Sequence, residues 1–281
     1  MGQTSKRLHT KLKTMAAPLH LPTGRIQSHA DMPNVEKFIE QGLDPVHAVY
    51  AFVQHITSRF AEGVSHLPEM KAFTKVVGAA EKEYMPSGPP MSPLTGSFFT
   101  TWASYDLRFD GTDTIASCLI EANDVVCMNP DQLDALKKLA ESRMGIFEHV
   151  GMDGSHVRLR ELVTSHEFAC HRASGYRGRT GELWYVRLLP PLLPDLARYH
   201  IAFTTPYILT QTTKHDWIQF LQRSMMQLEQ GDERQGLYRL LKYGPEPNYW
   251  NEFVFKAYHH HQGDAIFLAG IPDLQATLPH A

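Results

Sequence analysis

The fold of this chain is decided by the stretch MGIFEHVGMDGSHVRLRELV, residues 144–163. Apolar and polar residues alternate on both sides of Asp153-Gly154, and this period of two is typical of two β-strands joined by a tight turn. Further strand-like runs follow at 168–171, 183–189 and 200–204. We therefore predict a five-stranded antiparallel β unit over residues 144–209, in the form of a small barrel or a strongly curled sheet.

Helical patterns flank this β unit on both sides. Before it, Asp44-Pro45 combines an N-cap residue with a proline at the first helical position, and apolar residues then recur at helical spacing as far as Phe60. After Pro206 the helical spacing returns. The sequence therefore predicts an α+β protein with a helical N-terminal bundle, a central five-stranded antiparallel β unit and C-terminal helices.

The predicted boundaries follow these changes of pattern. The segments are a basic flexible tail, a helical domain, the β unit and C-terminal helices, at residues 1–30, 31–143, 144–209 and 210–281. Three consecutive histidines, from His259 to His261, are expected at the end of the last helix, where the helix dipole favours cations. The apolar run that begins at Ala265 is expected to add one strand to a sheet edge.

Composition excludes several classes of protein. The 281 residues carry a formal net charge of -3, so the chain as a whole does not attract nucleic acid or acidic lipid, and such binding requires a local patch. Three widely spaced cysteines match neither a disulfide framework nor a zinc knuckle and are typical of a reducing compartment. No apolar run approaches the roughly 20 residues of a membrane span. We expect a soluble cytoplasmic protein that needs no cofactor; the oligomeric state is not indicated.

A short segment before the β unit carries the letters of a catalytic motif. Residues 108–112 resemble the Asp-x-Asp-Gly-Thr signature of haloacid-dehalogenase-type phosphatases, in which the first aspartate is the nucleophile and the second is the general acid. Here Arg108 stands at the nucleophile position, so covalent phosphoryl transfer has no attacking carboxylate. We interpret the segment as an Asp110-Gly111 turn followed by a helix capped by Thr112 or Asp113.

Cysteine and histidine residues offer a second route to catalysis. Cys170 is the candidate nucleophile, although the neighbouring His171 points to the opposite face of a strand and cannot be its base. His166 and Cys170 lie about 13 Å apart on an extended strand, too far for one zinc ion to bridge. His259 and His261 are therefore the candidate metal ligands. Cysteine is also among the most frequently buried residue types, so a structural role for Cys170 remains the alternative.

The stretch HRASGYRGRTG, residues 171–181, combines arginines, a tyrosine and glycines without an acidic residue. Arginine presents a planar fork of donors to phosphate or carboxylate, tyrosine presents a face for stacking, and glycine allows close approach to the backbone. The candidate ligand-binding residues are Arg172, Tyr176, Arg177 and Arg179, together with Arg158 and Arg160 on a neighbouring strand. The alternative is that these arginines pair with Glu148, Glu161, Glu167 and Glu182 across the sheet.

Three functional hypotheses follow from these patterns. The favoured one is a non-enzymatic binding or regulatory protein whose Arg/Tyr/Gly loop binds nucleic acid or an acidic protein partner. The second is a cysteine- or metal-dependent hydrolase that uses Cys170 and histidines. The third is a structural subunit of a complex that buries its aromatic helix faces against a partner.

Overall fold

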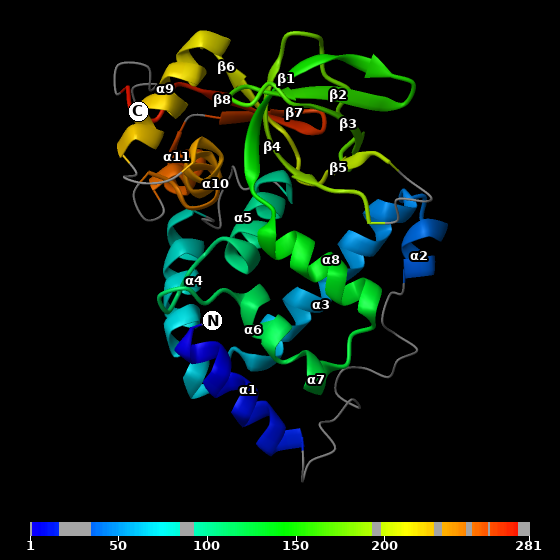
Figure 1. Cartoon of the computed structure of the whole chain (residues 1–281), viewed down its shortest axis with the longest axis vertical. Helices are drawn as coiled ribbons and strands as arrows, with labels where there is room; N and C mark the ends of the chain where they lie inside the picture. The colour runs from blue at the N-terminus through cyan, green and yellow to red at the C-terminus, as the bar shows by residue number, and fades with distance from the viewer. Residues whose placement is uncertain are drawn as a thin grey trace. The chain divides into compact units, whose positions relative to one another are not determined.

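A computed structural model describes residues 2–16, 35–84, 93–192, 198–227, 232–245, 249–257 and 259–274, apart from a few side chains that include those of His259 and His261. The chain divides into two units. The first comprises Met1–Glu83 and Thr100–Glu141, and the second comprises Tyr84–Phe99 and Ser142–Ala281. Figure 1 labels the elements of both units.

The first unit is helical. Its described elements are α1 (Gln3–Ala16), α2 (Val35–Glu40), α3 (Pro45–Val64), the 3-10 turn η1 (Pro68–Met70), α4 (Lys71–Tyr84), α6 (Ile115–Glu121), α7 (Asn123–Val126) and α8 (Pro130–Glu141), with the last residues of α5 (Pro93–Tyr105). The carboxylate of Asp44 accepts hydrogen bonds from the backbone N–H groups of Val46 and His47. The predicted cap of α3 is therefore confirmed.

Helix α1 replaces part of the expected flexible tail. Residues 3–16 form this helix, and Leu8 and Leu12 are buried on its inner side. The carboxylate of Asp113 accepts hydrogen bonds from the backbone N–H groups of Gly2, at 2.8 Å, and Ser5, at 3.0 Å. Because the first N–H groups of a helix have no partner within the helix, this carboxylate stabilises the start of α1.

The same contacts explain the letters that resemble a phosphatase motif. Asp110 accepts a hydrogen bond from the hydroxyl of Thr4 at 2.5 Å. Thr114, rather than the predicted Thr112 or Asp113, is the N-cap of α6 and forms a reciprocal capping box with Ser117. Asp110 and Asp113 thus hold the start of α1 in place. The interpretation of this segment as a turn followed by a capped helix is confirmed, except that the cap is Thr114.

The second unit contains the β-sheet. Its strands are β1 (Met144–Asp153), β2 (His156–Glu161), β3 (Glu167–Arg172), β4 (Leu183–Leu189), β5 (His200–Ala202), β6 (Tyr207–Thr210), β7 (His259–Gln262) and β8 (Ala265–Ala269). Within the described residues these strands form one sheet in the order β1-β2-β3-β5-β4-β6-β8-β7. Strand β1 also pairs with β4, which closes β1 to β5 into a small barrel (Figure 1). The predicted barrel is confirmed, but β3 and β5 run parallel, so the barrel is mixed rather than wholly antiparallel.

A bulge in β1 allows this strand to pair with β2 on one side and with β4 on the other. The register of β1 against β2 shifts between His149 and Gly151, so Val150 is an extra residue on β1. Gly151 has a φ of 136°, a conformation that glycine adopts without the strain of a side chain. Residues before the bulge pair with β4 and residues after it pair only with β2. The bulge therefore bends β1 enough to close the barrel.

The C-terminal part departs from the sequence prediction at three strands. Strand β6 forms where a return to helix was expected after Pro206. The histidines from His259 to His261 lie on β7 rather than at a helix end. Strand β8 is not at a sheet edge, because it pairs with β6 on one side and with β7 on the other. The hydrogen-bonded neighbours of these short segments are distant in sequence, which local patterns do not reveal.

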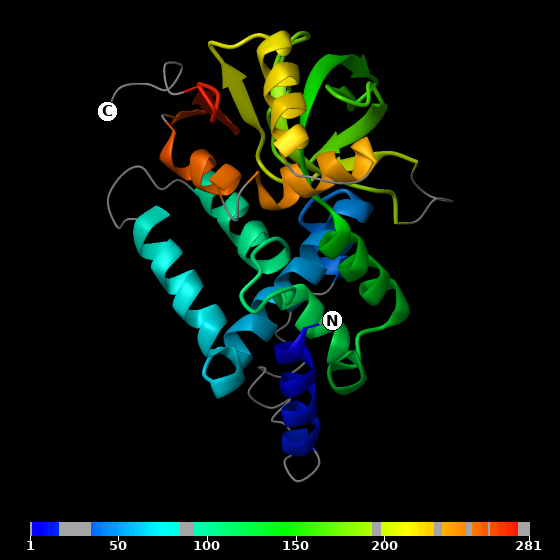
Figure 2. The same cartoon turned by 60° about the vertical axis from the view of Figure 1, so that its left-hand side comes forward.

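Within the described residues, the second unit holds the sheet, the first residues of α5 and three further helices: α9 (Lys214–Gln227), α10 (Glu233–Tyr243) and α11 (Tyr249–Lys256). Figure 2 shows them grouped together, with α9 in yellow and the other two in orange. The ring of Trp250 lies 5.8 Å from that of Trp217 and 5.4 Å from that of Phe220, measured between centroids. These aromatic contacts between α9 and α11 bury large apolar surfaces and hold the helices together.

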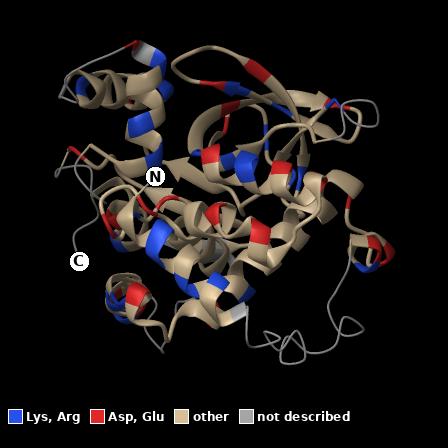
Figure 3. Ribbon diagram, turned by 60° about the horizontal axis from the view of Figure 1, so that its bottom comes forward, with Lys and Arg blue, Asp and Glu red and all other residues tan. Residues whose placement is uncertain are grey.

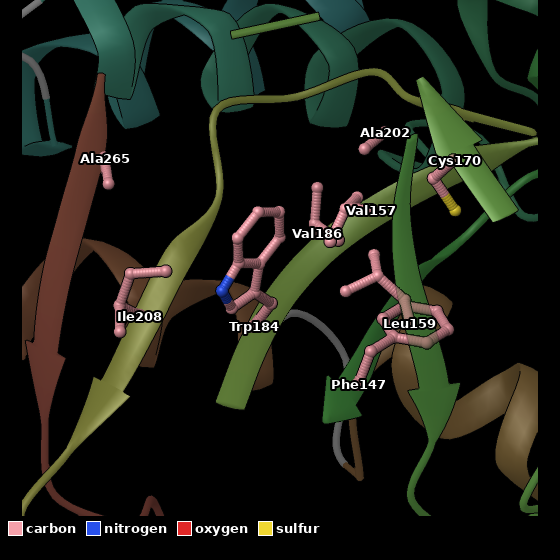
Figure 4. Close-up of a cluster of buried hydrophobic side chains, with 9 residues drawn as sticks. All are labelled: Phe147, Val157, Leu159, Cys170, Trp184, Val186, Ala202, Ile208 and Ala265. Carbon is pink, nitrogen blue, oxygen red and sulfur yellow. The ribbon is translucent and has the colours of Figure 1, made fainter. Parts of the chain in front are cut away.

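The interior of the barrel is apolar. Figure 4 shows its cluster of buried side chains, to which β1, β2, β3 and β4 contribute Phe147, Val157, Leu159, Cys170, Trp184 and Val186. Trp184 is 1% exposed and is among the largest fully buried side chains of the described residues. This ring forms the floor on which the candidate site is built.

Charges of both signs are interspersed along the ribbon (Figure 3). This distribution agrees with the small net charge of -3. Among the described residues, no helix has both the length and the apolar character needed to cross a membrane. Because positive and negative charges are mixed along the chain, any strong attraction for an anion must arise from a local cluster of charges.

Candidate functional site

The candidate site is centred on the segment between β3 and β4, residues 172–182, here called the Arg/Tyr/Gly loop. Both ends of this loop are fastened to the barrel by backbone hydrogen bonds. At the first end the N–H of Ala173 donates to the carbonyl of Ala202 on β5 at 3.0 Å. At the second end Gly181 and Glu182 exchange hydrogen bonds with His149 on β1, both at 2.8 Å. The loop is therefore held between two different strands.

The imidazole of His149 fastens the middle of the loop. This side chain is only 2% exposed and lies at the bulge of β1. Its Nδ1 accepts a hydrogen bond from the N–H of Gly151 at 3.2 Å, so Nδ1 carries no proton. Nε2 then carries the proton of the neutral ring and donates to the carbonyl of Arg177 at 3.2 Å. The bulge thus links barrel closure to the position of the loop.

Gly178 lets the loop lie directly against the barrel core. Its φ is +68°, and a Cβ atom at this position would lie 2.4 Å from a ring carbon of Trp184. No real Cβ atom is accommodated at that distance, so only glycine fits here without movement of the tryptophan. The backbone next to Arg177 and Arg179 is consequently fixed on a rigid aromatic surface.

Glu182 organises the polar side of the site. Its carboxylate accepts hydrogen bonds from the hydroxyl of Tyr176, at 3.0 and 3.1 Å, and from the indole N–H of Trp184 at 3.2 Å. Burial, reinforced by the hydrogen bond and the charge of Glu182, raises the pKa of Tyr176 to about 12. The phenol therefore stays protonated at physiological pH and remains a donor to Glu182.

A pocket of about 420 Å³ opens over this loop. One side is formed by residues 176–179 and Glu182, and the other by Gln262, Gly263 and Phe267 of the β7–β8 hairpin. The centroid of the Phe267 ring lies 6.2 Å from that of Tyr176 and 5.0 Å from that of His260. The volume lies within the range of about 300 to 1,000 Å³ that is usual for small-molecule pockets.

The candidate arginines divide into two groups. On β2, Arg158 and Arg160 both form ion pairs with Glu167 of β3, at 2.5 and 3.2 Å. This pairing is the alternative interpretation that the sequence allowed, and it holds for these two residues. In the loop, Arg177 and Arg179 are exposed, and among the described residues no carboxylate lies within 4 Å of either guanidinium to form an ion pair.

Arg172 has a structural role in the loop as well as a charge. It is half-buried, and its Nη1 donates a hydrogen bond to the carbonyl of Tyr176 at 3.2 Å. Burial, together with the neighbouring charge of Arg177, lowers the pKa of Arg172. Positive charge is thus crowded on this side of the loop, which favours the binding of an anion.

The other glutamates that the sequence offered as partners are engaged elsewhere. Glu161 pairs with Arg143 at 2.7 Å, and Glu148 pairs with Lys214 at 2.6 Å. Among the described residues, no cation lies within ion-pair distance of Glu182. Among the described residues, the cross-strand pairing that the sequence offered as the alternative is thus found around Glu167.

The cysteine and histidine candidates do not assemble into a described site. Cys170 is fully buried in the barrel interior, where burial raises the pKa of its thiol (Figure 4). A buried, protonated thiol is a poor nucleophile. Among the side chains that the structure describes, no group of three or more His, Cys, Asp or Glu residues is placed to hold a metal ion. The side chains of His259 and His261 lie outside the described part of the chain.

Sequence reasoning located the loop but missed most of its surroundings. His149 gave no signal, because its hydrogen bonds to Arg177, Gly181 and Glu182 join segments that are far apart in the sequence. Phe267 was recognised as part of a strand, but its place opposite Tyr176 follows from the pairing of β8 with β6. Glu182 was considered only as an arginine partner, whereas it accepts hydrogen bonds from Tyr176 and Trp184.

Comparison with known proteins identifies no relative. No model of a protein family matches the chain, and neither a curated protein nor a solved structure matches it at a significant level. We therefore infer a function from the geometry of the site.

Proposed function

We propose that this protein is a binding protein that holds single-stranded nucleic acid at the pocket over the Arg/Tyr/Gly loop. The observation that carries the proposal is the pair of exposed, carboxylate-free arginines, Arg177 and Arg179, on the rim of a pocket that Tyr176 and Phe267 also line. Guanidinium groups bind backbone phosphates, and aromatic rings stack on unpaired bases. A single strand supplies both partners at neighbouring positions.

The shape of the pocket favours a nucleic acid over an acidic protein. A pocket of about 420 Å³ accepts a flat group such as a base. An acidic protein segment, with a row of aspartates or glutamates, would leave this pocket empty. The strand order of the barrel, with β3 parallel to β5 and β1 closing on β4, is also that of the OB barrel, a fold that commonly binds oligonucleotides and oligosaccharides. A fold does not specify a function, so this analogy supports the proposal without carrying it.

Two double variants test the proposal. Arg177→Ala with Arg179→Ala removes the loop charges, and Arg158→Ala with Arg160→Ala removes equal charge from β2, where both arginines are paired. Binding of a fluorescent single-stranded oligonucleotide of mixed sequence is measured by anisotropy over a range of salt concentrations. We expect the loop variant to bind weakly and to lower the slope of log affinity against log salt by about 1.4, since each phosphate contact on a single strand contributes about 0.7.

The control variant decides whether the effect is local. It should keep nearly the affinity and salt slope of the unmodified protein, and both variants should retain its melting temperature. Equal losses in the two variants would mean that the oligonucleotide responds to general charge and would contradict the proposal. So would full binding by the loop variant, or no binding by the unmodified protein.

A further inference from the structure

We infer that the pocket selects a guanine base, and that Glu182 is the residue that reads it. This inference rests on the proposed binding of single-stranded nucleic acid and names the base that occupies the pocket. It is carried by the position of one carboxylate that lines the pocket, is fixed by two hydrogen-bond donors, and has no ion pair among the described residues.

The Glu182 carboxylate has more hydrogen-bond acceptor positions than its protein partners use. An ionised carboxylate offers about four lone-pair positions. Tyr176 donates one hydroxyl proton, shared between the two oxygens, and Trp184 donates one N–H proton. About half of the acceptor positions of Glu182 therefore remain for a ligand, and a ligand that fills them must bring two donors.

The bases differ in the hydrogen-bond donors and acceptors on their Watson–Crick edges. On its Watson–Crick edge guanine carries adjacent N1–H and N2–H donors, which match the two oxygens of a carboxylate. Adenine and cytosine each present one amino group beside a ring nitrogen that is an acceptor and would face the carboxylate unfavourably. Uracil has a single N–H between two carbonyl oxygens. Guanine alone supplies two adjacent donors without an acceptor between them.

The Glu182 carboxylate is held rigidly, as a group that distinguishes bases must be before the ligand arrives. The Glu182 backbone is hydrogen-bonded to His149, and its side chain is fixed by Tyr176 and by Trp184, which is 1% exposed. Burial and Glu182 raise the pKa of Tyr176, so this donor persists across the physiological range. The carboxylate is therefore preorganised for its ligand.

The other residues of the pocket are placed to hold the rest of the nucleotide. Tyr176 and Phe267 both line the pocket, with ring centroids 6.2 Å apart and ring planes at 89° to each other, and present aromatic surface to a base. Arg177 and Arg179 lie on the same loop as Tyr176, where they face the phosphates that flank the bound nucleotide. The loop thus divides the work: the arginines hold the backbone, the rings hold the base plane, and Glu182 distinguishes the base.

The test uses unmodified protein and a series of pentaribonucleotides that differ only at the central base. The central base of the sequence UUGUU is replaced by adenine, by hypoxanthine, which lacks the N2 amino group, or by 1-methylguanine, which lacks N1–H. We expect guanine to bind about tenfold more tightly than adenine, since a good bidentate contact discriminates by about that factor or more. Hypoxanthine should be intermediate, and 1-methylguanine should bind no better than adenine.

A protein variant provides an independent readout. Glu182→Gln keeps the size of the side chain but replaces one of its two acceptor oxygens by an amide NH2 donor, so it should abolish the preference for UUGUU while retaining the affinity for UUAUU. Glu148→Gln is the matched control, because Glu148 lies on the same barrel but pairs with Lys214 at 2.6 Å. This control should keep the preference for guanine.

The outcomes separate the two proposals. Equal binding of the guanine and adenine oligonucleotides that still depends on Arg177 and Arg179 would overturn the guanine inference alone. Failure of every oligonucleotide to bind would overturn the proposed function and this inference with it. If Glu182→Gln does not fold, the four oligonucleotides still decide the matter on the unmodified protein.

Discussion

Two pairs of arginines in the same barrel occupy opposite electrostatic environments. Arg158 and Arg160 stand on β2, where the antiparallel register places Glu167 directly opposite Arg160 and diagonal to Arg158. Arg177 and Arg179 stand in a loop outside the described strands, so no cross-strand register places a carboxylate opposite them. Neutralisation of an arginine on a sheet is thus decided by register, whereas in a loop it depends on what the rest of the fold brings near.

The comparison has a consequence for function. An arginine that already has a carboxylate partner must lose that ion pair to bind a phosphate, whereas the loop arginines exchange only water. The loop arginines also stand on a backbone fixed by His149 and Gly178, so little backbone entropy is lost when a ligand binds. Counting basic residues along the sequence would treat all of these arginines alike.

The largest effect is expected when the loop is lifted from the barrel. Gly178→Ala introduces a Cβ that would lie 2.4 Å from the Trp184 ring at a φ of +68°, and we expect it to lower the free energy of unfolding by about 3 kcal/mol. Oligonucleotide binding should fall with it. Chemical denaturation and anisotropy measure the two effects.

Gly181→Ala is the control for this prediction. Gly181 has a φ of +92°, but no heavy atom lies within 4 Å of the position of an added Cβ. This variant carries only the backbone strain, and we expect a loss of about 1 kcal/mol. Equal losses in the two variants would show that contact with Trp184 does not hold the loop.

A smaller effect is expected when the β2 arginines are made to resemble those of the loop. Glu167→Gln removes the carboxylate that Arg158 and Arg160 share, and so creates a second surface with unpaired positive charge. Binding of a mixed-sequence oligonucleotide should rise a few-fold at low salt, and the gain should disappear as salt is added. The melting temperature should hardly change, because exposed ion pairs contribute little net stability. An unchanged affinity at low salt would show that the ion pairs do not explain the difference between the two arginine groups.

The smallest effect is a pH dependence on the β3 side of the barrel. Burial, together with the charge of His166, lowers the pKa of His200 below its usual value of about 6.5. The unfolded chain therefore takes up a proton at a higher pH than the folded one. Stability is present above about pH 6.5 and is lost as the pH falls through the lower folded pKa.

His200→Phe tests this dependence. The substituted ring can still pack against Phe168, whose centroid lies 4.8 Å from that of His200, but it cannot be protonated. The melting temperature of the unmodified protein should fall more between pH 7.5 and pH 5.5 than that of the variant. The same fall in both proteins would assign the pH dependence to other groups.

The sequence predicts those parts of the fold that depend on neighbouring residues. The Asp153-Gly154 turn and the period-two alternation around it define β1 and β2, and the cap at Asp44 defines α3. Closure of β1 on β4 and the parallel pairing of β3 with β5 were not predictable, because each depends on hydrogen bonds between segments far apart in the chain. Strand β6 was missed because a short apolar run after a proline fits either a strand or a helix start.

The position of the loop was predictable to a similar extent, whereas its binding of an anion stays a prediction. The composition of residues 171–181 singled out this loop as a candidate anion-binding site, and the loop lines a pocket of about 420 Å³. The division of the arginines was not predictable, because it depends on the register of β2 against β3. Neither was the wall at Phe267, which reaches the loop only through the pairing of β8 with β6.

The far wall of the pocket also sets a timetable for the protein during synthesis. All five barrel strands leave the ribosome before the β7–β8 hairpin does, and α9, α10 and α11 are made in between. A nascent chain that closed its barrel at this stage would display Arg177 and Arg179 while the pocket still lacks Phe267. Under the proposed function, the loop would then attract RNA by charge with only part of the aromatic surface proposed to hold a base. The proposed selection of a base would begin only after the β7–β8 hairpin has been made.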